Sequence, residues 1–251
     1  MALVTGASLR LGRAIAVGLA QQGWDIAVHY LRSEADANLC VEQCAALGRR
    51  AIAVRADLSS EQQVLDLLGL VADGLGEPSC VVNNASRFDF DEASNFSVAH
   101  LDAQMHVNLC APILLARELR RRRRGLGYDS GAVVVNLLDQ KLFNPNPDFL
   151  SYTLSKAALE CATTLLAQAL APHVRVVGVA PGITLAAAGQ SPESFAAARQ
   201  STPLGRSSDV ADIVAAVAYL VAAPAVTGTT LVVDGGQHLV PSERDIMFVR
   251  R

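Results

Sequence analysis

Short apolar runs alternate with segments of helical periodicity along the whole chain, and this alternation constrains the fold most. Runs that are apolar at every position are typical of strands buried on both faces of a sheet, which favours parallel strands covered by helices. Strands are predicted over Ala2–Thr5, Asp25–His29, Ala51–Arg55, Ser79–Val82, Gly131–Leu138, Val174–Val179 and Thr229–Val233. Helices are predicted over Leu11–Gln22, Ala35–Leu47, Glu61–Gly74, Val98–Arg123, Ser151–Ala171 and Asp209–Val221. We therefore predict an α/β fold in which one doubly wound, mostly parallel seven-stranded sheet carries helices on both faces.

The composition supports a single globular domain over residues 1–251. Hydrophobic residues make up 51% and charged residues 18% of the chain, so a sizeable core can be buried. The net charge of −3 gives no general attraction to nucleic acid or to anionic lipid. The first strand begins too early to leave room for a signal peptide, and no apolar run reaches the ~18 residues that span a bilayer. Five cysteines without metal-binding spacing are expected to be reduced, so we expect a cytoplasmic protein without a metal site.

A glycine-containing turn follows the first predicted strand and leads into the first helix. The segment Thr5–Gly12 has the strand–turn–helix context in which backbone N–H groups and a helix N-terminus meet a pyrophosphate. This predicts a Rossmann-like dinucleotide site that includes Gly6, Leu11 and Gly12. Arg10 places a guanidinium beside the phosphates and favours an additional anionic group, such as a 2′-phosphate.

The end of the second strand indicates which dinucleotide is bound. NAD-selective folds place an acidic residue here for the ribose 2′-hydroxyl, but the first acidic residue of this chain is Glu34, beyond the turn. Arg32 and Ser33 offer a cation and a hydroxyl instead. We expect NADPH/NADP+ as the cofactor, while Arg32 as a merely solvated charge at a helix start is the alternative.

Asp139, Tyr152 and Lys156 form the candidate catalytic group. Tyr152 and Lys156 are four residues apart in a predicted helix and therefore share one face. A phenol titrates near ~10 in water, and an adjacent ammonium is expected to lower its pKa so that it can act as an acid. Asp139 follows an apolar strand, at the edge where open α/β sheets place their ligands.

Two further segments have a less definite interpretation. Residues 185–201 are rich in Ala, Gly and Ser and are expected to form a mobile lid, and the tail 237–251 contains the apolar run Ile246–Val249, which is expected to dock at a subunit interface. The arginine run Arg120–Arg124 is either a polyanion patch or a solvated helix end, and the absence of interleaved aromatics favours the helix end.

Taken together, these motifs resemble the short-chain dehydrogenase/reductase family over essentially the whole chain. The matching pieces are Thr5–Gly12, Asp57-Leu58, Asn83-Asn84-Ala85, Asn108, Tyr152 with Lys156, Pro181-Gly182 and Val233–Gly236. The resemblance implies that Asp57 and Leu58 border the adenine, that Asn84 and Ala85 back the ribose, and that Pro181, Gly182 and Ile183 line the nicotinamide. It also implies that Asn108 holds a water chain to Lys156, that Lys156 binds the nicotinamide ribose, and that the protein is a homotetramer or homodimer. In a tetramer or dimer of this family, helices near Val98–Arg123 and Ser151–Ala171 would pack across a two-fold axis.

Two residues that differ from the usual family pattern resemble the pteridine reductase branch, which includes dihydromonapterin and dihydrofolate reductases. Asp139 stands where the family usually has Ser, and Arg10 where it usually has Gly; the strings His29–Ser33, which includes Tyr30, and Asn83–Phe88 also match this branch. The branch implies that Arg10, Ser86 and Phe88 contact the pterin, with Phe88 stacking on it. Phe88 as an ordinary loop-covering residue is the alternative.

The chemistry of Asp139 favours the same branch of the family. An ionised carboxylate accepts hydrogen bonds and would repel the oxyanion that develops when a ketone is reduced. It suits a ring with N–H donors, and in its protonated form it can deliver a proton to a ring nitrogen. We therefore predict an NADPH-dependent reductase of a pteridine C=N bond. The alternatives are a carbonyl or 3-oxoacyl-thioester reductase and a non-catalytic NADP-binding sensor or scaffold.

Overall fold

The computed structural model describes residues 1–127, 131–186 and 191–248, and its centre is one parallel seven-stranded sheet. The strand order is β3-β2-β1-β4-β5-β6-β7, and every neighbouring pair is parallel. The strands are β1 (Ala2–Val4), β2 (Ile26–Tyr30), β3 (Ala51–Arg55), β4 (Cys80–Asn83), β5 (Ala132–Leu137), β6 (Val174–Pro181) and β7 (Thr230–Val233). The predicted fold class is confirmed, and the strand boundaries shift by no more than two residues.

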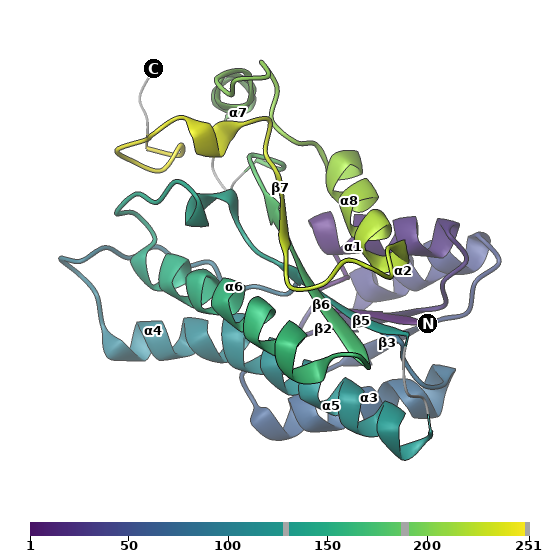
Figure 1. The fold of residues 1–251 in the computed structure, drawn as a ribbon. Coiled ribbons are helices and arrows are strands. Elements are labelled where there is room, and N and C mark those ends of the chain that lie inside the picture. The colour runs from purple at the N-terminus through teal and green to yellow at the C-terminus, as the bar shows by residue number, and fades with distance from the viewer. Residues whose placement is uncertain (128–130, 187–190, 249–251) are drawn as a thin grey trace.

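Helices cover both faces of the sheet, as the apolar character of the strands requires (Figure 1). One face carries α1 (Arg10–Gln21), α2 (Glu34–Ala46) and α8 (Val210–Ala222), and the other carries α3 (Glu61–Leu75), α4 (Val98–Met105), α5 (Ala111–Gly125) and α6 (Leu150–Leu170). Side chains that alternate along each central strand divide between two large clusters, one under each layer of helices. The sheet is therefore the rigid support on which the loops at its edge are held.

The prediction of one continuous helix over Val98–Arg123 is wrong. Between α4 and α5 the chain forms a π-helical turn, His106–Cys110, in which the N–H of Ala111 donates to the carbonyl of His106. Pro112 lies at the start of α5 and has no N–H to continue the α-helical hydrogen-bond pattern, so a wider turn fits here. This irregular turn carries Asn108.

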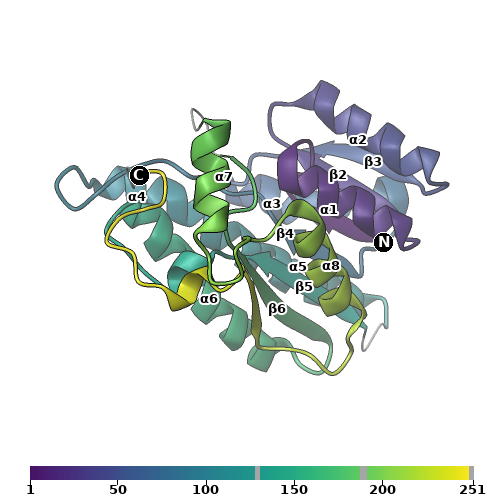
Figure 2. The same ribbon diagram turned by 90° about the horizontal axis from the view of Figure 1, so that it is seen from above.

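The segment expected to be a lid contains a helix that was not predicted. Helix α7 spans Pro192–Gln200, with Ser191 as its N-cap and Pro192 in its first turn, a combination that favours helix initiation. Residues 187–190 of the expected lid lie outside the described part of the chain, and lid motion stays a prediction. Helix α7 and the segment after β7 lie together beside the loops at one edge of the sheet (Figure 2).

Candidate functional site

A cavity of about 1130 Å³ lies at the carboxyl edge of the sheet. The strand order reverses between β1 and β4, and ligands of doubly wound folds bind where such a reversal opens a crevice. The walls come from distant parts of the chain: Arg10 and Leu11, Ser86 to Phe90, Leu138 to Gln140, Tyr152, Pro181 to Leu185, and residues of the tail after β7. Nine of the predicted site residues therefore meet in this one cavity: Arg10, Leu11, Ser86, Phe88, Asp139, Tyr152, Pro181, Gly182 and Ile183.

The turn between β1 and α1 is tight enough to require glycine at two positions. Gly6 has a φ of +60°, and a Cβ at Gly12 would lie 2.2 Å from the carbonyl oxygen of Gly6. Asn84 fixes the turn, because its side-chain amide donates to the carbonyls of Thr5 at 2.9 Å and Gly6 at 3.1 Å. Arg10 also has a positive φ, 52°, which aims its side chain away from α1 toward the cavity. The turn thus has the close packing and donor set that fit a dinucleotide pyrophosphate.

His29 holds the same turn from the second strand, a role that the sequence analysis did not foresee. The N–H of Gly6 donates to His29 Nδ1 at 3.0 Å, which leaves Nε2 to donate to the carbonyl of Ala56 at 3.1 Å. Burial lowers the pKa of His29 to about 4, so the ring is neutral and can accept from Gly6. The only signal in the sequence is a histidine within an otherwise apolar strand.

The residues predicted to select the cofactor lie at the carboxyl ends of β2 and β3. Tyr30 is buried, Arg32 is exposed, and Ser33 precedes α2 without using its hydroxyl to cap it. Leu58 is buried, and the Asp57 carboxylate accepts from the backbone and hydroxyl of Ser59, which lowers its pKa. A cation and a free hydroxyl at this edge fit a phosphorylated ribose.

Tyr152 is hydrogen-bonded to Asp139 at the cavity wall. The phenol donates to Asp139 Oδ2 at 2.9 Å, and the N–H of Lys141 donates to Asp139 Oδ1 at 2.8 Å. Asp139 follows β5 and caps a short 3₁₀ turn, Gln140–Leu142, which aims its carboxylate at helix α6. Two residues thirteen positions apart are therefore in direct contact and can exchange a proton.

The pKa values of Tyr152 and Asp139 are both raised. Burial raises the pKa of Tyr152 well above its ordinary value, and the neighbouring Asp139 charge raises it further. Burial also raises the pKa of Asp139, against the lowering effect of its two hydrogen bonds. The expectation that Lys156 lowers the pKa of Tyr152 is therefore wrong for this arrangement, because the group bonded to the phenol is a carboxylate.

Lys156 lies one turn further along α6 and is buried. Its ammonium donates to the carbonyl of Leu137 at 2.6 Å and lies 5.9 Å from the centre of the Tyr152 ring. Burial lowers its pKa to about 8. Its contact with the end of β5 fixes the helix face that carries Tyr152 against the strand.

Asn108 is fully buried and bonded through both ends of its amide. Its Nδ2 donates to Ser155 Oγ at 2.9 Å and to the carbonyl of Arg87 at 2.9 Å. Its Oδ1 accepts from the N–H of Arg87 at 2.8 Å and from the hydroxyl of Ser86 at 3.2 Å. These bonds connect the π-helical turn to α6 and to the loop after β4; the water chain from Asn108 to Lys156 stays a prediction.

An aromatic cluster lines the cavity next to Tyr152. Phe88 stacks on Phe149 with 4.3 Å between ring centres and 14° between planes. Phe88 also makes an edge-to-face contact with Tyr152, with 4.6 Å between ring centres. Phe88 remains 46% exposed, so it is not an ordinary core residue. Phe149, which the sequence analysis missed, supports the Phe88 ring from behind and leaves a flat aromatic surface at the cavity.

The tail after β7 docks on its own chain, beside this aromatic cluster. Arg244 forms an ion pair with the buried Asp148 at 2.7 Å, and Asp245 forms one with the buried Lys141 at 3.1 Å. The ring of Phe248 lies 6.0 Å from that of Phe149 and 5.2 Å from that of Phe90. The tail thus forms an intramolecular wall of the cavity; its docking at a subunit interface stays a prediction, and Val249 lies outside the described residues.

Pro181, Gly182 and Ile183 leave the end of β6 along the cavity floor. The N–H of Gly182 donates to the carbonyl of Val233, which keeps this segment beside β7. Across the cavity mouth, Arg10 donates to the carbonyl of Ala186 at 2.9 Å. The phosphate turn is thereby connected to the start of the predicted lid.

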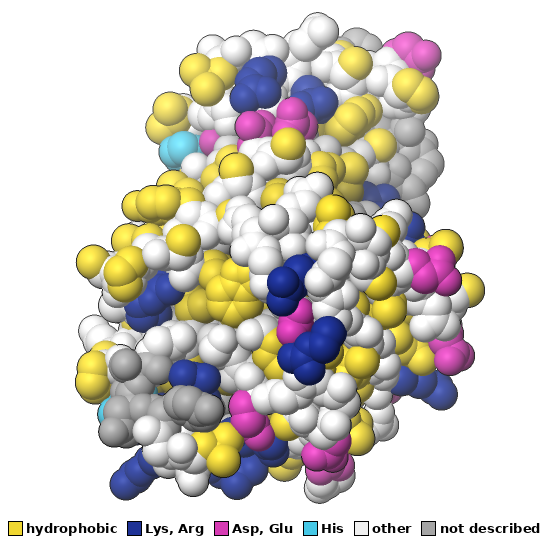
Figure 3. All heavy atoms as spheres, turned by 90° about the vertical axis from the view of Figure 1, so that its right-hand side faces the viewer, with side chains coloured by type: hydrophobic (Ala, Val, Ile, Leu, Met, Phe, Trp, Pro, Cys, Tyr) yellow, Lys and Arg dark blue, Asp and Glu magenta, His cyan; other side chains and the backbone are white. Residues whose placement is uncertain are grey.

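The remaining predictions concern features away from the cavity. The arginine run occupies the last turns of α5, where Arg122 pairs with Glu77 and Arg121 with Glu118. Its predicted position at a helix end is confirmed, whereas Arg123 is buried rather than solvated. On the face drawn in Figure 3, basic and acidic side chains are interspersed rather than gathered in one patch. Within residues 1–127, 131–186 and 191–248, we find no membrane-spanning helix and no metal-binding cluster of His, Cys, Asp or Glu.

Comparison with known proteins identifies the family. A family model described as enoyl-(acyl carrier protein) reductase matches residues 6–238. The L-rhamnose 1-dehydrogenase (NAD(P)(+)) of a Sphingomonas species is 31% identical, over 94% of this chain and 95% of that enzyme. The chain therefore belongs to the short-chain dehydrogenase/reductase family and is an oxidoreductase.

Among solved structures, the likeness is to the pteridine-reductase-like branch of the family. The FolM alternative dihydrofolate reductase 1 of Brucella canis, complexed with NADP, is 38% identical with a TM-score of 0.90, over 98% of this chain and 96% of that one. The corresponding enzyme of Brucella suis, also with NADP, is 38% identical with a TM-score of 0.90, over 96% of each chain.

Proposed function

We propose that this protein is an NADPH-dependent reductase of a pteridine C=N bond. The observation that carries the proposal is the hydrogen bond between Asp139 and Tyr152, at a cavity wall that faces the exposed ring of Phe88. An acid whose pKa is raised, next to a flat aromatic surface, suits the protonation of a stacked nitrogen heterocycle. The similarity to two FolM dihydrofolate reductases supports the same substrate class.

NADP(H) fits the edge of the sheet from β1 to β3. Gly6, Leu11 and Gly12 would hold the pyrophosphate, Arg10, Arg32 and Ser33 the 2′-phosphate, and Tyr30, Asp57, Leu58, Asn84 and Ala85 the adenosine. The bound cofactor would supply the hydride. Pro181 to Ile183, with Lys156, would orient the nicotinamide end toward Tyr152.

The contact between Asp139 and Tyr152 provides a route by which a proton can reach the substrate. A protonated Asp139 can donate to the phenol oxygen, and this frees the phenol proton for the substrate nitrogen. The net change is one proton lost from Asp139 for each hydride received at the ring carbon. Phe88 and Ser86 would orient the heterocycle, and Asn108 would keep their loop in place.

A carbonyl or acyl-thioester reductase is the rival within the same family, because the relatives include a granaticin polyketide synthase putative ketoacyl reductase that is 32% identical. The test is NADPH oxidation with dihydrobiopterin, dihydromonapterin and dihydrofolate, in parallel with an acetoacetyl thioester. Turnover of a dihydropterin that is lost in Phe88→Ala supports the proposal. Turnover of the thioester alone, with Phe88→Ala as active as wild type, rules it out.

We further propose a homodimer or homotetramer in which α5 and α6 pack across a two-fold axis. Helix α6 presents an exposed stripe, Leu154, Cys161 and Leu165, whose spacing places all three side chains on one face. An exposed apolar stripe on a long helix favours burial against a second copy. The cytoplasmic location stays a prediction from the cysteines.

A further inference from the structure

Helix α6, which carries Tyr152 in its first turn, begins without a cap of its own. Its N-cap residue is Phe149, which has a left-handed conformation (φ 56°, ψ 51°) and no side-chain hydrogen bond to the helix. The first N–H groups of a helix have no intrahelical acceptor and need partners from elsewhere. The position of Tyr152 therefore depends on the groups that accept hydrogen bonds from the first N–H groups of α6.

Asp91, sixty residues earlier in the chain, supplies those partners. The N–H of Ser151 donates to Asp91 Oδ1 at 2.9 Å, and the N–H of Leu150 donates to the Asp91 carbonyl at 3.2 Å. The Ser151 hydroxyl donates to Asp91 Oδ2. Asp91 is 1% exposed, and its carboxylate lies at the positive end of the helix dipole. A carboxylate this buried is stable only when it is hydrogen-bonded in this way.

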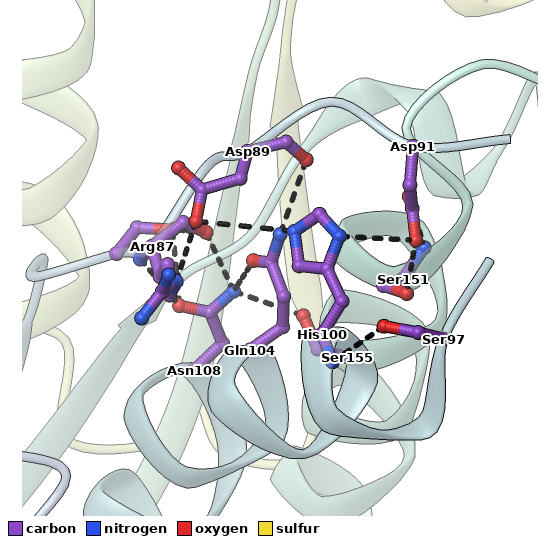
Figure 4. A network of polar contacts seen from close by, with 10 residues as sticks. Arg87, Asp89, Asp91, Ser97, His100, Gln104, Asn108, Ser151 and Ser155 are labelled. Atoms are coloured by element: carbon purple, nitrogen blue, oxygen red, sulfur yellow. Dashed lines mark hydrogen bonds and ion pairs between the residues drawn. The ribbon is translucent and has the colours of Figure 1, made fainter. Parts of the chain in front are cut away.

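The same loop carries Phe88 and is fixed at further points (Figure 4). Gln104 donates to the carbonyl of Asp89 at 3.2 Å, and Asn108 binds the backbone of Arg87 and the hydroxyl of Ser155 in α6. His100 lies between the two carboxylates, 3.7 Å from Asp91 and 3.9 Å from Asp89, which is beyond hydrogen-bond length. The part of the loop from Arg87 to Asp91 is therefore fastened to α6, directly at Asp91 and through Asn108 at Arg87.

We infer that Asp91 is a positioning residue of the active site, which caps α6 from outside and thereby sets the Tyr152 phenol relative to Asp139 and the Phe88 ring. Asp91 is connected to both Tyr152 and Phe88 along the chain: its partner Ser151 directly precedes Tyr152, and Phe88 lies three residues before Asp91. Loss of the carboxylate would leave the first turn of α6 without its acceptors and would free both walls at once. The inference rests on the proposed role of Tyr152.

Kinetics of three variants test this inference. Asp91→Ala is expected to lower kcat by about tenfold to a hundredfold, the scale of a reacting group displaced by about 1 Å, with the NADPH Kd unchanged. Asp91→Asn is expected to restore kcat to within about threefold of wild type, because an amide can accept from the Ser151 N–H and donate to its hydroxyl. The matched control is Asp25→Ala, which removes a carboxylate bonded to Arg49 and Arg50 at the opposite edge of the sheet and should retain kcat.

Hydrogen exchange gives a readout that does not depend on the substrate. In Asp91→Ala the amides of residues 150–153 should exchange faster, while those of α3 should not change. Wild-type kcat and exchange in Asp91→Ala, or an equal loss of kcat in Asp25→Ala, overturns the inference. If Asp91→Ala does not fold, Ser151→Ala probes the same contact, and we expect it to lower kcat by about threefold to tenfold. Wild-type kcat together with wild-type exchange in Ser151→Ala would overturn the inference as well. If no pteridine is turned over, the proposed function fails while the exchange result still decides on Asp91.

Discussion

Asp139 is the residue on which the proposed chemistry of the site depends most. Its partner Tyr152 has a raised pKa, so the phenol is a poor acid unless Asp139 returns a proton to it. We expect Asp139→Asn to lower kcat for a dihydropterin by about 10²–10⁴, the usual contribution of a general acid, with little change in NADPH affinity. Steady-state kinetics and a cofactor titration measure the two effects, and a variant with more than a tenth of wild-type kcat would contradict the proton route.

Asp139→Ser separates the two substrate classes from each other. A serine hydroxyl can donate to a developing oxyanion but cannot supply a proton at neutral pH. Dihydropterin turnover should therefore be lost in this variant, whereas the turnover of an acetoacetyl thioester should rise if the enzyme is a carbonyl reductase. Pteridine turnover that stays intact in this variant would contradict the assignment of Asp139 as the proton source.

His29 makes the stability of the phosphate turn depend on pH. Its pKa is about 4 in the folded protein and 6.5 when unperturbed, so the unfolded chain binds the additional proton between these values. The contribution of His29 is complete above pH 6.5 and is lost as the pH falls toward 4, by about 3 kcal/mol in total. Urea unfolding across this range should show a shallower dependence on pH in His29→Gln, and an unchanged dependence would mean that other groups dominate.

Arg32 provides the simplest test of cofactor choice. It is exposed at the end of β2, where a 2′-phosphate would lie. A charge-assisted hydrogen bond contributes about 1.5–3 kcal/mol, so Arg32→Ala should weaken NADPH binding by about tenfold or more and leave NADH binding nearly unchanged. Equal losses for both cofactors would indicate a structural role for Arg32.

At this scale, local spacing was enough to predict some site residues and not others. The four-residue separation of Tyr152 and Lys156 places both on one helix face in any sequence. No such regularity connects Asp91 to Ser151 or His29 to Gly6, because their hydrogen bonds form only after distant strands and helices have packed. The direction of the Tyr152 pKa shift could not be predicted for the same reason, since it depends on how deeply the fold buries the phenol and on which charged group lies beside it.

At the scale of elements, the tail after β7 forms one wall of the cavity and is held in place by ion pairs. Arg244 and Asp245 hold it to Asp148 and Lys141, two residues that are almost fully buried. We expect Arg244→Ala to raise KM by about tenfold with a smaller effect on kcat, because one charged hydrogen-bonded pair is lost and the tail opens. Faster proteolytic cleavage within residues 237–248 would accompany this change, and an unaltered KM would exclude the tail from the substrate site.

The elements differ in how well their sequences predicted them. The boundaries of α3 and α6 follow from clear apolar periodicity and were predicted to within one residue. The π-helical turn was not predicted, because the apolar pattern continues through it and only Pro112 signals an interruption. Helix α7 was also missed, since its alanine-rich sequence differs little in composition from that of a flexible loop.

At the scale of the molecule, the doubly wound arrangement could be predicted because seven apolar runs alternate with helices and the crossovers are right-handed. The docking of the tail could not, since its apolar side chains are equally compatible with a subunit interface. Its intramolecular ion pairs become visible only when Asp148 and Lys141 are placed beside it.

The exposed stripe on α6 predicts how copies of the chain associate. We expect Leu154→Glu combined with Leu165→Glu to dissociate the oligomer, because two charges would be buried without partners. Light scattering after gel filtration measures the mass of wild type and variant. A monomeric wild-type protein, or an oligomer that survives both substitutions, would place the interface elsewhere or remove it.

The π-helical turn at His106–Cys110 also limits which changes in chain length the fold can tolerate. A π turn holds one residue more than the α-helix around it, so a one-residue deletion here would leave a regular helix rather than a broken one. Because the wider turn already absorbs that residue, the helix on either side would keep nearly the same rotational phase, and the change would fall on the turn itself. Asn108 lies within the turn, so its hydrogen bonds to Ser155 and to the backbone of Arg87 are the contacts that the deletion would disturb. A deletion that looks harmless in an alignment would therefore detach the Phe88 loop while the helix itself stays intact.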